Sequence, residues 1–190
     1  MPIPRSPEDR FHIAGRPTPL TLGLFWQWAA SDLTSNALRG VLAEFLVGQA
    51  VGCLGPGRLE WDACDLRHPS GLRLEVKASG YLQSWAQSNL SKPSFDIAPK
   101  RSWDALSNTY ASSIMRSSDV YVFALHAHTE RETLDPLNID QWRFYVVATA
   151  TLNARCAGQK RIGLPSLTRL AERPVSFLEL AEAVAAAGMT

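Results

Sequence analysis

The chain has 190 residues, of which 46% are hydrophobic and 19% are charged, a composition typical of a globular domain with a core and not of a disordered chain. Its net charge of +1 excludes a chain-wide basic field, so any contact with nucleic acid has to come from a local patch. The three cysteines are widely spaced and form no CxxC pair, which argues against a disulfide framework or a zinc site. No hydrophobic run approaches the length of a membrane span, and we expect a soluble, cytoplasmic protein without a membrane partner.

Residues 1–34 are predicted to form an N-terminal arm with an aromatic helical segment, outside a main domain at residues 35–190. Residues 1–18 are rich in proline and charge and show no periodicity, which indicates an extended arm. Residues 20–30 contain Phe25, Trp26 and Trp28, and we expect a short helix laid across the domain.

Residues 37–51 are predicted to form a helix that Ser35 or Asn36 caps. Glu44 lies among apolar neighbours of this helix, where a carboxylate is costly unless it is paired with a cation or a metal. The interpretations of Glu44 stay open: it is a functional group, or it forms a salt bridge to Arg39 or faces solvent. The expected core stripe of the helix consists of Leu38, Val41, Leu42, Phe45 and Leu46.

The most informative stretch is a predicted β-hairpin with arms at residues 61–66 and 72–77 and a turn at residues 68–71. Because successive side chains of a strand point to opposite faces, Glu75 and Lys77 should share one face, while the apolar residues that alternate with them enter the core.

This hairpin carries the groups that metal-assisted phosphodiester hydrolysis needs. Carboxylates are hard oxygen ligands for Mg²⁺, and a lysine on the same face can steady attacking water or developing charge. An exposed hairpin with an ion pair across its strands would give the same pattern.

The remainder of the chain offers weaker signals. Residues 81–87 are expected to form a short helix or loop, from which Gln83 could reach a phosphate or a metal-bound water, although a surface glutamine is commoner. Buried strands are predicted at residues 119–125 and 142–152, and a short strand at 94–97. A local basic patch suited to phosphate contacts consists of Lys92, Lys100, Arg101 and Arg116.

The order of these elements resembles the PD-(D/E)XK nuclease superfamily over roughly residues 37–125: a helix with Glu44, an aspartate-bearing strand, the Glu-x-Lys strand, then a helix and a strand. The resemblance implies an α/β fold with a restriction-endonuclease-like core, in which a mixed central β-sheet is flanked by helices in the order αβββαβ. Residues 35–190 would then be a nuclease domain with a C-terminal helix.

Carried over by position, the resemblance makes Asp65 and Glu75 metal ligands, the backbone carbonyl of Val76 a third ligand, and Lys77 the catalytic lysine. Glu44 matches a helical glutamate that orients the lysine or joins a second metal.

The choice of aspartate stays open, because the proline that precedes it in the family is absent and Cys64 stands before Asp65. Asp62 is the alternative ligand, and on a regular strand the two aspartates would face opposite sides. We prefer Asp65 because it lies nearer the turn, and a β-bulge would reverse this choice.

The leading hypothesis is a Mg²⁺-dependent endonuclease of the restriction or repair type, in which Mn²⁺ can substitute, acting on DNA with RNA not excluded. Its site residues would be Asp65, Glu75 and Lys77, supported by Glu44 and Gln83. The alternative is a non-catalytic nucleic-acid-binding module that keeps the nuclease fold, and a third hypothesis is a partner-binding scaffold that uses the aromatic N-terminal segment. The resemblance is also compatible with a homodimer, in which two sites address two strands.

Overall fold

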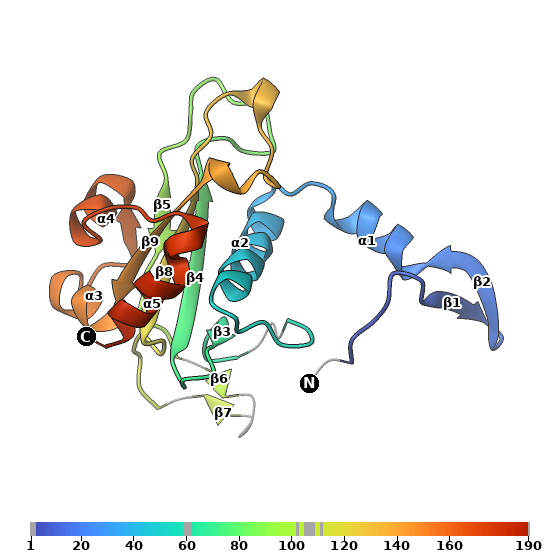
Figure 1. The fold of residues 1–190 in the computed structure, drawn as a ribbon, viewed down its shortest axis with the longest axis horizontal. Coiled ribbons are helices and arrows are strands. Elements are labelled where there is room, and N and C mark those ends of the chain that lie inside the picture. The colour runs from blue at the N-terminus through green and yellow to red at the C-terminus, as the bar shows by residue number, and fades with distance from the viewer. Residues whose placement is uncertain (1–2, 59–61, 102, 105–108, 111, 190) are drawn as a thin grey trace.

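A mixed four-stranded sheet forms the centre of the protein in a computed structural model, which describes residues 3–58, 62–101, 103–104, 109–110 and 112–189 (Figure 1). The strand order is β3 (Leu66–Arg67), β4 (Arg73–Gly80), β8 (Val120–His126) and β9 (Trp142–Ala148). The two central strands, β4 and β8, run parallel, whereas β3 and β9 are antiparallel to their neighbours. The expected α/β class with a mixed sheet is confirmed at this level.

The sheet is buried on both faces, each by its own hydrophobic cluster. On one face pack α2 (Asn36–Ala50) and α5 (Leu180–Gly188), and on the other pack α3 (Thr149–Arg155) and α4 (Leu164–Leu170). Every residue of β8 is buried, as the apolar run at 119–125 predicts. The predicted strand at 142–152 is β9 followed by α3, so its C-terminal third is helical.

Small elements surround this centre. A two-stranded sheet joins β5 (Ser94–Asp96) to β10 (Arg161–Gly163), and another joins β6 (Trp103–Asp104) to β7 (Thr109–Tyr110). Short 3₁₀ turns occupy Arg131–Thr133, Ile139–Gln141 and Phe177–Glu179.

The predicted hairpin is present, but its first arm is shorter than expected. Only Leu66 and Arg67 pair with β4, and residues 62–65 are irregular, while Trp61 lies outside the described residues. The reason is local competition for the backbone: Asp62 accepts a hydrogen bond from the N–H of Ala63, which takes the chain out of the ladder. The alternation on β4 is confirmed, since the apolar residues at 74 and 76 are buried and belong to the core cluster.

Helix α2 begins where the sequence predicts, with the Ser35 hydroxyl accepting from the N–H of Leu38. The predicted core stripe is confirmed only in part: Leu46 is buried in the core cluster and Leu42 packs against it, whereas Val41 and Phe45 are 38% and 52% exposed. The buried side of the helix is closely packed at Gly48, where a Cβ would meet Leu54 and Leu66 at 2.4 and 3.2 Å. Its buried residues are Arg39, Ala43, Leu46, Val47 and Gly48.

No helix occurs among the described residues between β4 and β8, although the resemblance predicts one there. Residues 81–93 form a loop, within which the side-chain amide of Gln87 donates to the carbonyls of Tyr81 and Asn89. The helix of the expected αβββαβ order is therefore absent from this described part of the connection.

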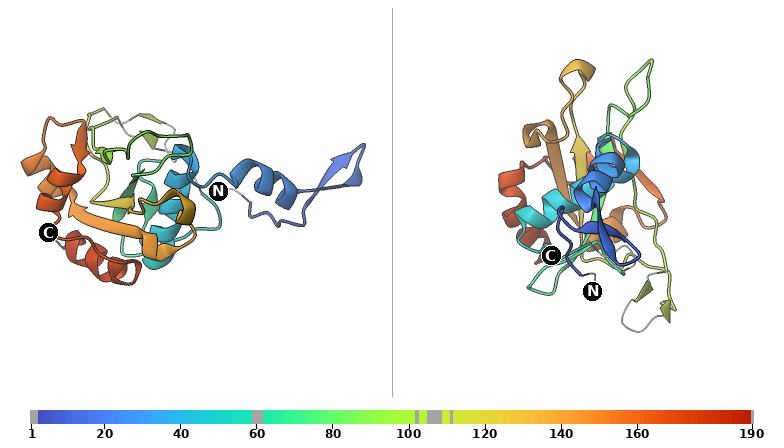
Figure 2. Two further views of the ribbon diagram at one scale, coloured as in Figure 1. Left: turned by 90° about the horizontal axis from the view of Figure 1, so that it is seen from above. Right: turned by 90° about the vertical axis from the view of Figure 1, so that its right-hand side faces the viewer.

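The N-terminal residues form a hairpin and a helix that extend away from the sheet (Figures 1 and 2). Strands β1 (Arg10–Ile13) and β2 (Arg16–Thr21) meet at a two-residue turn, Ala14 and Gly15, with φ of 49° and 75°. Helix α1 (Leu22–Ala30) follows, and none of its residues is buried. The short helix predicted within residues 20–30 is present, but it does not lie across the sheet, and part of the predicted extended arm forms a hairpin (Figure 1). No helix of the described chain is long and apolar enough to span a membrane.

Candidate functional site

Lys77 lies between two carboxylates on the face of β4 opposite α2 and α5. Its Nζ atom is 2.5 Å from Oε1 of Glu75 and 3.9 Å from Oδ2 of Asp65. The three side chains are only 18–23% exposed, so their charges interact with little screening by water. Three of the predicted site residues therefore converge.

Each carboxylate of this cluster is fixed by a further hydrogen bond. Oδ2 of Asp65 accepts from the N–H of Val76 at 2.7 Å, and the N–H of Asp65 donates to the carbonyl of Leu74 at 3.1 Å. Oε2 of Glu75 accepts from the hydroxyl of Ser118 at 3.1 Å. Sequence reasoning missed Ser118, because it reaches Glu75 only through the parallel pairing of β4 with β8.

Burial and mutual repulsion change the titration of the cluster. Burial, and after it the charge of Glu75, raise the pKa of Asp65 to about 6, although Lys77 and the N–H of Val76 act in the opposite direction. Burial lowers the pKa of Lys77, but Glu75 and Asp65 outweigh it and the net shift is upward. At neutral pH the ammonium of Lys77 is thus charged.

Glu44 does not contact Lys77. It forms a two-point ion pair with Arg58, with distances of 2.5 Å from Nε to Oε2 and 2.9 Å from Nη2 to Oε1. Arg39, the partner suggested by the sequence, is instead buried. Glu44 and Asp65 nevertheless line the same pocket of about 430 Å³, and the charge of Glu44 contributes to the raised pKa of Asp65.

Of the two competing aspartates, the structure brings Asp65 to Lys77. Asp62 pairs with Arg67 instead, at 2.9 Å to Nη2 and 3.0 Å to Nε. Both aspartates line the pocket that Glu44 lines, so Asp62 is near the cluster without contacting its lysine.

Gln83 is buried and its amide is fully engaged with the protein. Its Nε2 donates to the carbonyl of Gly80 and the hydroxyl of Ser91 at 3.0 and 3.1 Å, and its Oε1 accepts from Arg39 at 3.0 Å. These bonds anchor the loop after β4, so the expected reach of Gln83 to a phosphate is not supported by its contacts.

A second pocket, of about 410 Å³, is lined by Lys77 itself. Its wall includes the exposed cations Lys92 and Arg161 and the exposed ring of Trp85. Arg161 was not among the predicted basic residues; it is brought here because β10 pairs with β5.

The predicted basic patch is only partly a surface. Arg116 is buried and donates to the carbonyls of Ile97 and Cys156, so its role is structural. Lys100 pairs with Asp96 at 2.6 Å. Of the predicted patch, Lys92 lines the second pocket together with Lys77.

The described residues contain no group of three or more His, Cys, Asp or Glu side chains placed to hold a metal ion. Two carboxylates, Asp65 and Glu75, lie beside Lys77, and Mg²⁺ is commonly bound in proteins through one or two carboxylates while it keeps several waters. His126 is buried against Trp142, with ring centroids 4.8 Å apart.

Comparisons with known proteins give no relative: no protein-family model matches the chain, and no significant match is found among curated proteins.

Proposed function

We propose that the protein is a Mg²⁺-dependent endonuclease that hydrolyses phosphodiester bonds of DNA on a restriction-endonuclease-like core. The observation that carries the proposal is the placement of Lys77 between Asp65 and Glu75, with Nζ 3.9 Å from an oxygen of Asp65 and 2.5 Å from an oxygen of Glu75, at the wall of a pocket with further cations.

The carboxylates supply the cation site. Asp65 and Glu75 are held by Val76 and Ser118, so their oxygens need little reorganisation to bind an ion. The raised pKa of Asp65 reflects negative charge that a divalent cation would compensate. Bound Mg²⁺, or Mn²⁺ in its place, would polarise the phosphate and lower the pKa of a coordinated water.

Lys77 supplies a fixed positive charge. Because its pKa is raised, it keeps its proton at neutral pH and acts as a hydrogen-bond donor to negative oxygen as charge develops on the phosphate. Glu44, held by Arg58, would act at longer range through its charge on Asp65.

The second pocket supplies the approach for the substrate. Lys92 and Arg161 are exposed and line the second pocket together with Lys77. Cations in this arrangement suit the phosphates of a nucleic-acid strand. With a chain-wide net charge of only +1, binding should depend on this local group and weaken as salt is raised.

The test is cleavage of supercoiled plasmid with Mg²⁺, with Mn²⁺ and with a chelator. The wild-type protein should nick or cut only with a metal, and Lys77→Ala should lower the rate by about 100-fold or more, the usual effect of removing one charge-stabilising donor. Lys160→Ala is the matched control, since Lys160 is exposed, lies outside both pockets and should leave cleavage at the wild-type rate. Equal cleavage by Lys77→Ala and wild-type protein would refute the assignment.

A second function is favoured by a different observation, the tight pairing within the cluster. Lys77 is bound to Glu75 and Glu44 to Arg58, an arrangement that a non-catalytic nucleic-acid-binding module would also show. Calorimetry with MgCl₂ separates the two: the enzyme should bind the cation and lose this binding in Asp65→Asn, whereas a pure binder should show DNA affinity at low salt without Mg²⁺ uptake.

A further inference from the structure

The second pocket, which Lys77 lines, combines an aromatic ring with two exposed cations. Trp85 on its wall is 55% exposed. Among the described residues, neither Lys92 nor Arg161 forms an ion pair with a carboxylate, and Arg161 donates to the neutral hydroxyl of Ser94 at 2.8 Å. A wall of this kind suits a ligand that has both an aromatic face and negative charge, and a nucleotide has both.

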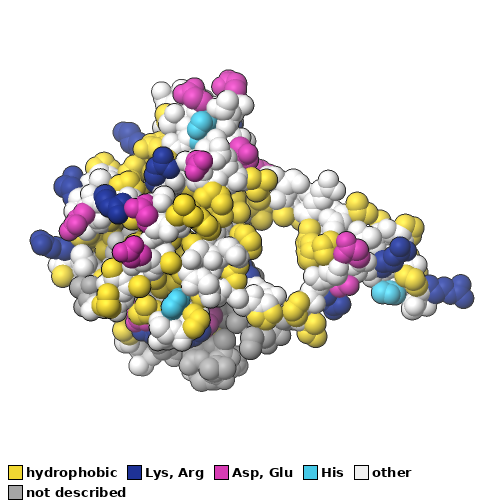
Figure 3. Space-filling view, viewed as in Figure 1, with side chains coloured by type: hydrophobic (Ala, Val, Ile, Leu, Met, Phe, Trp, Pro, Cys, Tyr) yellow, Lys and Arg dark blue, Asp and Glu magenta, His cyan; other side chains and the backbone are white. Residues whose placement is uncertain are grey.

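The charge of the wall is positive where the ring is exposed. Asp96 also lines the pocket, but Lys100 pairs with this carboxylate at 2.6 Å and offsets its charge. Lys92 and Arg161 therefore contribute positive charge that attracts an anion. On the face shown in Figure 3, Lys and Arg side chains are interspersed with Asp and Glu and form no continuous basic surface, so the attraction has to be local.

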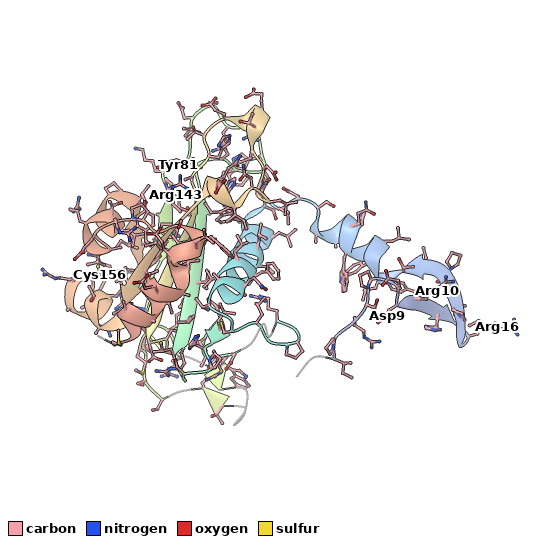
Figure 4. The ribbon with its side chains drawn as sticks, in the orientation of Figure 1. Asp9, Arg10, Arg16, Tyr81, Arg143 and Cys156 are labelled. Carbon is pink, nitrogen blue, oxygen red and sulfur yellow. The ribbon has the colours of Figure 1, made fainter. Side chains whose placement is uncertain are left out.

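Trp85 belongs to a loop, residues 81–93, that hydrogen bonds hold in place. The loop starts at Tyr81, which is labelled in Figure 4, and the N–H of Ser91 closes it by donating to the carbonyl of Tyr81 at 2.9 Å. Arg131, from the neighbouring connection, donates to the carbonyl of Trp85 at 3.2 Å. Because the backbone that carries the ring is already fixed, a ligand loses little affinity to the ordering of this loop.

The volume of the pocket decides which form of DNA it admits. About 410 Å³ lies near the lower end of the range of about 300–1,000 Å³ for small-ligand pockets, so one nucleotide can enter and a duplex cannot. In a duplex both faces of a base are covered by neighbouring base pairs, so a base can stack on Trp85 only where the strand is unpaired or the base has left the helix. Duplex DNA is bound instead through its phosphates and groove edges, which need no aromatic ring in a recess.

We propose that the second pocket binds one unpaired nucleotide of DNA, with its base stacked on the ring of Trp85 and its phosphates held by Lys92 and Arg161. The inference rests on the proposed function and deepens it, since it makes the substrate single-stranded DNA or DNA with an unpaired segment. Because Lys77 lines the same pocket, the phosphodiester bond that adjoins this nucleotide lies beside the lysine of the carboxylate cluster. Every base has a face that can stack, so we expect little sequence preference at this position.

The experiment is fluorescence anisotropy of the full chain at low salt in EDTA, so that binding is measured without cleavage. The two probes are a labelled single-stranded oligonucleotide of mixed sequence and the duplex that it forms with its complement. Wild-type protein should bind the single strand about 5-fold or more tightly than the duplex, the smallest usual gain from one stacked base. Trp85→Ala should weaken binding of the single strand by about 5- to 150-fold and leave binding of the duplex unchanged.

Three further variants separate stacking from other roles of the wall. Trp85→Phe keeps an aromatic ring and should retain most of the affinity for the single strand. Trp28→Ala is the matched control, because Trp28 is 84% exposed on α1, does not line the pocket and should leave both affinities unchanged. Lys92→Ala should reduce the slope of log K against log salt for the single strand by about 0.7, the value for one lost phosphate contact. Circular dichroism verifies folding, which we expect to be intact because none of these side chains is buried.

Each contrary result overturns the proposal. Equal affinity for the two probes excludes an unpaired nucleotide, as does the absence of binding to either one. A Trp85→Ala protein that binds the single strand as wild type does, or a Trp85→Phe protein as weak as Trp85→Ala, excludes stacking. Failure of the nuclease assignment gives a different result: a preference for the single strand that depends on Trp85, without cleavage in Mg²⁺, keeps the nucleotide pocket and removes the enzyme. Plasmid cleavage with equal affinity for both probes keeps the enzyme and removes the pocket.

Discussion

Replacing Asp65 by asparagine should make the folded protein more stable at pH 8. Burial and Glu75 raise the pKa of Asp65 from 3.8 to about 6, so between these values the folded chain holds a proton that the unfolded chain has released. Stability then falls as pH rises through this window, and the full penalty is present above about pH 6. About two pKa units, at 1.36 kcal/mol each, give roughly 2–3 kcal/mol.

Asparagine imitates the protonated carboxyl, and its oxygen can still accept from the N–H of Val76. Thermal unfolding should show a Tm for Asp65→Asn about 4–12 °C above wild type at pH 8 and almost equal to it at pH 4, given the usual 2–4 °C per kcal/mol for a chain of this size. Asp62→Asn is the control, since Asp62 pairs with Arg67 and its loss should bring no gain.

The reasoning fails if Asp65→Asn is less stable than wild type at pH 8, or if its gain is as large at pH 4. Mg²⁺ adds an independent readout. If Asp65 binds the cation, Mg²⁺ should raise the Tm of the wild-type protein at pH 8 and leave that of Asp65→Asn unchanged.

Three further predictions concern stability, measured as the free energy of unfolding in denaturant. Arg116→Ala should lower the free energy of unfolding by about 3 kcal/mol, because it removes a buried guanidinium that donates to several carbonyls. The control Arg101→Ala, at an exposed position, should change the free energy of unfolding by less than about 0.5 kcal/mol. Equal effects of the two substitutions would contradict a structural role for Arg116. Phe123→Ala should cost about 3–5 kcal/mol, because Phe123 is fully buried between β5 and β9, and a loss below about 1 kcal/mol would contradict that packing. Ser176→Ala should cost about 1 kcal/mol by removing the capping box before α5, and an unchanged midpoint would show that the cap contributes nothing.

The face of β4 could be predicted from the sequence because strand periodicity is a local property. Alternation alone separates Glu75 and Lys77 from the buried residues between them, and the structure confirms it. The Ser-x-x-Glu spacing of Ser176 and Glu179 is likewise a local signal that predicts a capping box, and the structure contains it.

Contacts between distant segments could not be predicted in this way. Helix α2 carries apolar residues on more than one face, so periodicity does not decide whether Ala43 or Phe45 meets the sheet. The partner of Glu44 is Arg58, in a loop whose path has no sequence signal, and Ser118 reaches Glu75 across 43 residues. The sequence thus indicates which groups share a strand, whereas the residues from distant segments that contact these groups depend on the tertiary fold.

The parallel pairing of β4 with β8 has a consequence for how the chain folds. The bond from Arg73 to Asp119 spans 46 residues, and the described part of that connection contains no helix to shorten the search. Closing such a loop lowers the conformational entropy of the chain before any stabilising contact forms, so the pairing of β4 with β8 should form late in folding. During synthesis β4 would have an open edge until β8 leaves the ribosome, which makes this strand the segment most in need of protection from aggregation. Fragments ending before β8 should accordingly misassemble and not keep partial activity.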